Sequence, residues 1–94
     1  MNVLDVTISD QAATLSHFEG LRATLLSPAA AAPGARLFCV LTEGRLPLAG
    51  DRVLKVKVHR CVKVEGGFRI DGKAFDLRRP LRLALQQYFA PPSA

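Results

Sequence analysis

The sequence has few of the features that mark exported, metal-binding or membrane-spanning proteins. Its two cysteines, Cys39 and Cys61, lie far apart, and neither they nor the two histidines form a pair at metal-ligand spacing. The longest apolar runs, such as residues 37–41, are far shorter than the ~20 residues of a membrane-spanning helix. The N-terminus carries Asp5 and no basic segment before an apolar run, so we expect no signal peptide. These absences predict a cytoplasmic protein with reduced thiols and no membrane span.

The composition predicts one folded domain with a basic surface. A chain of 94 residues fits a single domain over residues 1–94, and an apolar fraction of 49% excludes an intrinsically disordered chain. Lysine and arginine number 13 against 8 acids, which gives a net charge of +5 and a pI near 9.9. This charge permits phosphate, nucleotide or anionic-protein partners without selecting among them.

Alternation of apolar and polar residues predicts strands over most of the chain. It appears at residues 4–8 and again at 21–25, whereas residues 36–42 are apolar on both faces and predict a buried central strand. Two prolines and Gly34 frame the alanines of residues 27–34, which predicts a loop between two strands.

The best-defined element is a long strand at residues 52–65. Its apolar face carries Leu54, Val56, Val58, Val62 and Val64, and Arg60 falls on this face out of pattern. Either a bulge near residues 59–60 or an arginine with a buried stem would explain that exception. Residues 65–67 predict a hairpin turn, residues 68–71 the return strand, and residues 71–72 a second turn or bulge.

The period changes near the C-terminus. Leu81, Ala84, Leu85 and Tyr88 follow the spacing of an amphipathic helix, with Asp76 as its N-cap and Pro80 in its first turn. We therefore expect a mostly β protein: a small antiparallel β-barrel of five to six strands over residues 3–75, with one C-terminal helix over about 77–89.

Three local patterns resemble the PilZ domain family of bacteria. They are the turn at residues 15–22 with Ser16 and Gly20, the Gly-plus-Arg strand openings at residues 33–37 and 50–53, and the ending at residues 75–89. The resemblance implies a PilZ-like barrel related to receptors for cyclic di-GMP. Residues 1–20 contain no arginine, however, and the sole R-x-x-x-R runs from Arg78 to Arg82, so the family's nucleotide motif is missing. The resemblance thus implies a degenerate nucleotide site, with cyclic di-GMP binding weak or absent, and an adaptor role.

No catalytic motif is present, so we expect the protein not to be an enzyme and to need no cofactor or metal. His17, which we place in the turn, and His59 lack a serine or cysteine nucleophile at a motif spacing, and the acids are scattered.

Basic residues form the most coherent polar feature. A possible anion-binding set comprises Arg22, Arg36, Lys55, Lys57, His59 and Lys63. The alternative is a solvated outer face whose lysines discourage edge pairing. We place Phe38, Phe68 and Phe75 in the core, which leaves no aromatic ring on this basic face to favour nucleic acid.

The C-terminal helix offers a second surface, because Leu83 and Phe89 lie to one side of its core-facing stripe. They could bind a partner or a second copy, or belong to a wide core face. The predicted function is a non-catalytic signalling adaptor of PilZ-like form whose partner is most simply another protein. The alternatives are a nucleic-acid-binding small barrel of low specificity and a cyclic-di-GMP receptor that uses Arg22 and Arg36.

Overall fold

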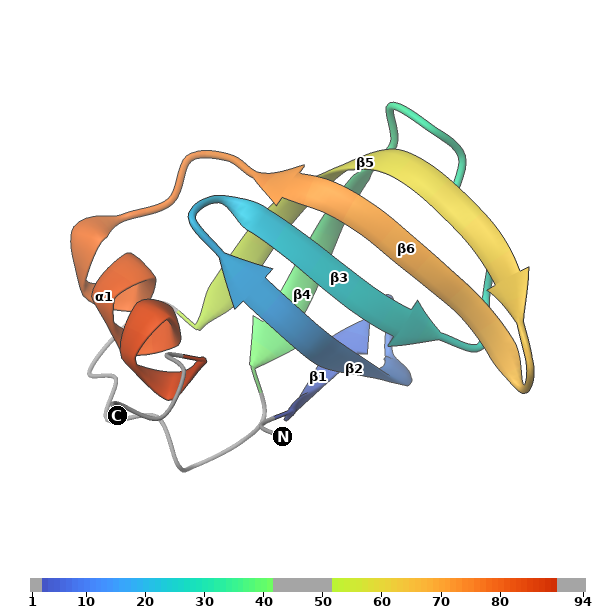
Figure 1. Ribbon diagram of the computed structural model, residues 1–94, viewed down its shortest axis with the longest axis horizontal. Coiled ribbons are helices and arrows are strands. Elements are labelled where there is room, and N and C mark those ends of the chain that lie inside the picture. The colour runs from blue at the N-terminus through green and yellow to red at the C-terminus, as the bar shows by residue number, and fades with distance from the viewer. Residues whose placement is uncertain (1–2, 42–51, 90–94) are drawn as a thin grey trace.

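In the part of the chain that the structure describes, six antiparallel strands close into a barrel and one helix follows them (Figure 1). The computed structural model describes residues 3–41 and 52–89. The strands are β1 (Leu4–Ile8), β2 (Gln11–Glu19), β3 (Arg22–Ser27), β4 (Arg36–Leu41), β5 (Val53–Val64) and β6 (Gly67–Ala74). Their order around the barrel is β1-β2-β3-β6-β5-β4, and β1 pairs with β4 to close it. The predicted fold class, a small antiparallel barrel with a C-terminal helix, is confirmed.

The connection between β3 and β4 links strands that are not neighbours. β3 pairs with β2 and β6, whereas β4 pairs with β1 and β5. Two backbone hydrogen bonds tie the loop between them to β5. The amide of Gly34 donates to the carbonyl of Val58 at 2.7 Å, and the amide of Val58 donates to the carbonyl of Ala35 at 2.8 Å. The loop predicted between two strands is therefore confirmed.

The barrel interior is filled by the side chains that point inward at every second position along the strands. Aliphatic side chains dominate it, and among the described residues no polar or charged side chain is buried. The largest fully buried side chains are Leu4, Leu15, Leu25, Leu41, Leu54, Ile70, Leu85, Val6, Val56, Val58 and Cys39. Each buried aliphatic side chain of this size contributes about 1.5–3 kcal/mol, so this interior is the main source of stability.

A bulge divides β5 into two halves that use opposite faces. The pairing with β6 shifts register between Val58 and Arg60, which confirms the predicted bulge. Leu54, Val56 and Val58 face the core before it, but after it Cys61 pairs with the buried Ile70. Because one extra residue reverses the alternation, Val62 and Val64 turn to the outer face and are only half-buried. The prediction that all five apolar residues share one buried face is wrong for these two.

The strand β2 was not predicted, because a bulge interrupts its alternation. Its register against β3 shifts between Leu15 and His17, so Phe18 rather than His17 faces the core. His17 lies within this strand and not in a turn, which corrects our placement; the turn itself follows at Gly20, whose φ is 62°.

Of the turn or bulge predicted at residues 71–72, the turn is wrong, because β6 runs through these residues without interruption. A bulge does occur at this level, but its extra residue lies on β5, opposite residues 71–72. Gly72 faces inward, where an added Cβ would lie 2.4 Å from the carbonyl oxygen of Lys57 and 2.7 Å from Val56 Cγ1. This glycine allows close approach of β5 and β6 and does not mark a turn.

The helix α1 (Arg79–Tyr88) packs on the barrel through Leu81 and Leu85. The Tyr88 hydroxyl donates to the carbonyl of Val3 at 2.7 Å, which ties the end of the helix to the start of the chain. Pro80 lies in the first turn as predicted, but Arg78 is the N-cap residue. Asp76 is therefore not the cap: it has a φ of 50° and its carboxylate bonds Lys55 instead. Within the described ranges no helix has the length and apolar character needed to cross a bilayer.

Candidate anion-binding surface

Four basic side chains form one continuous row across the outside of the barrel. They occupy directly opposed positions on four adjacent strands. The row, called the basic row below, consists of Arg22 on β3, Lys73 on β6, Lys57 on β5 and Arg36 on β4. All four are exposed. Three steps of about 4.8 Å between strands make the row about 14 Å long. Like charges directly opposite one another destabilise a sheet, so this row opposes folding.

The acidic residues nearest to the basic row are engaged elsewhere. Glu19 lies opposite Arg22, but its carboxylate is 3.5 Å from Nε2 of His17. The carboxylate of Asp76 contacts Nζ of Lys55 at 2.7 Å. Within residues 3–41 and 52–89, no member of the basic row forms an ion pair with a carboxylate. The positive charge of the row is therefore not compensated by a paired side chain from these segments.

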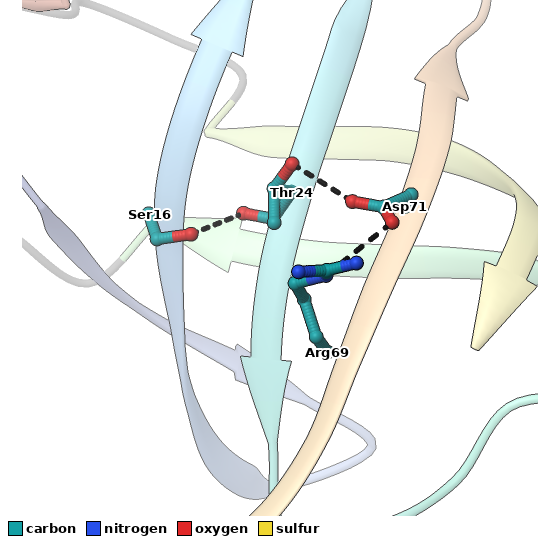
Figure 2. Close-up of polar contacts among 4 residues, drawn as sticks. All are labelled: Ser16, Thr24, Arg69 and Asp71. Carbon is teal, nitrogen blue, oxygen red and sulfur yellow. Dashed lines mark hydrogen bonds and ion pairs between the residues drawn. The ribbon is translucent and has the colours of Figure 1, made fainter. Parts of the chain in front are cut away.

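Asp71, the remaining acid beside the row, is fixed by a polar network on β2, β3 and β6 (Figure 2). The Ser16 hydroxyl donates to the carbonyl of Thr24 at 3.2 Å, and the Thr24 hydroxyl donates to Oδ1 of Asp71 at 3.0 Å. Nε of Arg69 lies 3.5 Å from Oδ2 of Asp71. Both carboxylate oxygens thus point to partners outside the basic row.

One aromatic ring lies exposed beside the basic row. Phe38 is two residues along β4 from Arg36, opposite Lys55, and 53% of it is exposed. Our prediction that Phe38 belongs to the core is wrong, because β4 alternates: Cys39 and Leu41 face inward, and Phe38 faces outward. Phe18 fills the core instead.

Two further rings lie partly buried, and one of them orients Arg36. The guanidinium carbon of Arg36 lies 5.7 Å from the centroid of the Phe75 ring, within the range of a cation–π contact. Phe68, on β6, is half-buried. The exposed ring beside the row is therefore that of Phe38.

A shallow groove adjoins the other side of the row. It crosses the outer faces of β2, β3, β6 and β5 and contains both histidines. Its charged or titratable lining residues are His17, Glu19, Arg22, His59, Arg60, Asp71 and Lys73. The β5 bulge turns Arg60 outward, opposite Asp71, so a residue that the sequence left out of pattern becomes part of this surface.

The structure gathers part of the anion-binding set predicted from the sequence. Arg22, Arg36 and Lys57 join the basic row, and His59 lies in the groove. Lys55 is held by Asp76, and Lys63 lies beyond the bulge opposite Phe68. Sequence reasoning missed Lys73 and Arg60, because only the strand register places them beside the others.

The other predicted surfaces are only partly exposed. Leu83 on α1 is 40% exposed, but Phe89 is half-buried, packs against the core and makes an edge-to-face contact with Tyr88 at a centroid distance of 5.1 Å. Ser16 and Gly20, the pair from the turn pattern, lie in β2 and in the turn that follows it.

Two titratable groups have clearly shifted pKa values. The hydrogen bond from Lys55, together with its charge, holds the pKa of Asp76 below the ordinary 3.8. Burial raises the pKa of the Cys39 thiol to about 12, so this thiol stays protonated and unreactive near neutral pH. Both cysteines are free, and in the described ranges no three His, Cys, Asp or Glu side chains gather as a metal site would require.

Comparison of the chain with protein-family models, with curated proteins and with solved structures finds no match in any of the three.

Proposed function

We propose that this chain is a non-catalytic binding module of PilZ-like form whose basic outer face binds a negatively charged macromolecule. The observation that carries the proposal is the basic row of Arg22, Lys73, Lys57 and Arg36. Direct opposition of like charges costs stability, and the nearby carboxylates of Glu19 and Asp76 contact His17 and Lys55 and not the row. An anionic ligand would neutralise the row and recover that cost.

A signalling adaptor that docks on an acidic protein is the second candidate function. The exposed apolar side chains of Phe38 and Val40 on β4 favour it, because an apolar centre with a charged surround suits a protein partner. In this proposal the module works in the cytoplasm with both thiols reduced. A homodimer through this face is disfavoured, because two copies of the basic row would repel each other. Exposed apolar side chains elsewhere, such as Leu83 on α1 and Leu26 on β3, remain for self-association.

The proposal includes weak or absent binding of cyclic di-GMP. Arg22 and Arg36 stand at opposite ends of the basic row, separated by β6 and β5. They therefore cannot act as a pair of forked donors on one small dinucleotide. Isothermal titration with cyclic di-GMP at tens of micromolar protein should give no measurable heat of binding. Low-micromolar binding that disappears in Arg22→Ala would contradict this point.

Salt elution from a heparin column tests the main proposal, since heparin is a generic polyanion. The variant Lys57→Glu with Lys73→Glu changes two members of the basic row. Its matched control, Lys63→Glu with Arg82→Glu, makes the same change in net charge at exposed positions outside the row. We expect the row variant to elute at clearly lower salt than the control. Equal elution of the two variants would show that only net charge matters, and the proposal would then be wrong.

A further inference from the structure

We infer that the polyanion bound by this module is single-stranded nucleic acid, with phosphates along the basic row and a base stacked on Phe38. This inference rests on the proposed function and specifies its ligand. Two observations that are independent of net charge support it: the path of the basic row around the barrel, and the exposure of an aromatic ring at one end of that path.

The path of the row suits a flexible strand better than a rigid rod. β3 and β4 stand three positions apart in a closed ring of six strands, so their outer faces point in opposite directions. In Figure 1, β3 and β6 lie toward the viewer and β4 lies behind them. A ligand that contacts Arg22 and Arg36 together must therefore bend around the barrel, across strands whose backbones span three spacings of about 4.8 Å. Duplex DNA has a persistence length of about 50 nm and cannot follow such a bend cheaply, whereas a single strand can.

The ring of Phe38 supplies the contact that distinguishes a base from an acidic peptide. More than half of this residue is exposed, and it follows Arg36 by two positions on the outer face of β4. Two residues along a strand span about 6.6 Å, so a phosphate at Arg36 leaves the adjacent base within reach of the ring. Stacking on an exposed ring strengthens single-strand binding and tolerates any base sequence. A carboxylate side chain has no flat apolar face to stack in this way.

Lys55 and Phe75 define the surroundings of this stacking position. Lys55 lies opposite Phe38 and is held by Asp76 at 2.7 Å, so it does not block the ring with a free ammonium. The Phe75 ring holds the Arg36 guanidinium through the contact at 5.7 Å, which reduces the mobility that this arginine would lose on binding a phosphate.

Fluorescence anisotropy on the full chain tests the inference with three labelled probes: a 16-nucleotide single strand, a duplex of the same length and a polyglutamate peptide of similar charge. We expect the single strand to bind most tightly. Its log affinity should fall with log salt at a slope of about −3, from four phosphate contacts at about 0.7 each. The double variant Lys57→Glu with Lys73→Glu should reduce the magnitude of this slope to about half, whereas the control Lys63→Glu with Arg82→Glu should leave the slope unchanged.

Substitutions at Phe38 separate stacking from simple apolar contact. We expect Phe38→Leu to weaken single-strand binding about fivefold or more and Phe38→Trp to preserve it. Val40→Leu serves as the matched control, because Val40 is exposed on the same strand and has no ring. Circular dichroism and thermal melting confirm that each variant remains folded.

The possible results overturn different statements. Equal or tighter binding of the duplex, or a Phe38→Leu variant that binds like the wild type, would reject single-stranded nucleic acid while the polyanion proposal stands. Preferential binding of polyglutamate would reject it in favour of an acidic protein partner. Failure of all three probes to bind at 50 mM salt, with the heparin elution insensitive to the row, would overturn both the inference and the proposed function.

Discussion

The inner and outer faces of the same strands differ in how their side chains affect the stability of this barrel. On the inside, Ala23, Gly72 and Val58 stand opposite one another on β3, β6 and β5, fully packed and without a polar atom to satisfy. One residue away on each strand, the outer face carries the basic row, whose members on β3, β6, β5 and β4 face like charges across each shared strand pair. The inner face therefore maximises stability, whereas the outer face gives some of it up. In the proposed function, this stability cost is retained because the row binds a ligand.

The strongest test of this contrast places the same charge on either face of β5. We expect Val58→Asp to unfold the domain, because a buried unpaired carboxylate costs several kcal/mol out of a total of about 5–15 kcal/mol. Val62→Asp should remain folded, because the bulge turns Val62 outward, opposite Arg69. Urea denaturation followed by circular dichroism measures both. Loss of fold in both variants would mean that the bulge does not reverse the face.

A smaller effect is expected where β5 and β6 approach most closely. In Gly72→Ala the new methyl group would lie 2.4 Å from the Lys57 carbonyl oxygen, so the backbone must move. Overpacking of this kind costs about 1–3 kcal/mol, or a fall in Tm of roughly 4–8 °C per kcal/mol in a domain of this size. Differential scanning calorimetry measures the change. A Tm equal to that of the wild type would show that the two strands can separate without cost at this point.

On the outer face we expect a substitution to stabilise the fold. Lys73→Glu replaces two like-charge contacts, with Arg22 and Lys57, by two attractive ones. Pairs at exposed positions are worth about 0.2–1 kcal/mol each, so the free energy of unfolding should rise by that order at low salt and return toward the wild-type value at high salt. Chemical denaturation at 20 mM and 500 mM salt measures it. Lys63→Glu, which has Phe68 opposite, should show a smaller change; a destabilised Lys73→Glu would contradict the cost assigned to the row.

The smallest expected effect concerns the ion pair beside the row. Lys55 lowers the pKa of Asp76, so the folded state binds this proton more weakly than the unfolded state. The stabilisation is present above the unfolded pKa near 3.8 and is lost as the pH falls through the lower folded pKa. In a carboxyl-detected NMR titration, Lys55→Gln should raise the pKa of Asp76 toward its ordinary value, whereas Lys57→Gln should change it much less. No response to Lys55→Gln would assign the shift to another group.

The sequence was sufficient for the fold class because alternation survives in most strands. β1, β3 and the first half of β5 show one apolar face each, and the glycines after Glu65 mark the hairpin. Prediction from alternation failed at both bulges. The bulge in β2 interrupts the pattern, so this strand was not predicted, and the bulge in β5 moves Val62 and Val64 to the outer face. A bulge is invisible to a fixed period of two, since it changes the face of every residue that follows.

The site was less predictable than the fold, because it exists only through register. Lys73 is a single lysine on β6, and nothing near it in the sequence indicates that Arg22 and Lys57 flank it. Phe38 was misplaced for a different reason: residues 36–42 are apolar on both faces, and composition alone cannot distinguish a buried strand from one with an exposed ring. Only the closure of the barrel decides which face is inside.

The β5–β6 hairpin also bears on strand-to-strand association between molecules. Residues 53–57 of β5 pair with β4 on one side and β6 pairs on the other, but residues 60–64 pair with β6 alone in the part of the chain that the structure describes. This short stretch is an open edge onto which another strand could add. It begins at a bulge and carries the exposed charges of Arg60 and Lys63, two devices that discourage edge-to-edge growth. Lys63 thus has an expected use that requires no ligand: its charge disfavours the addition of another molecule's strand along this stretch of β5.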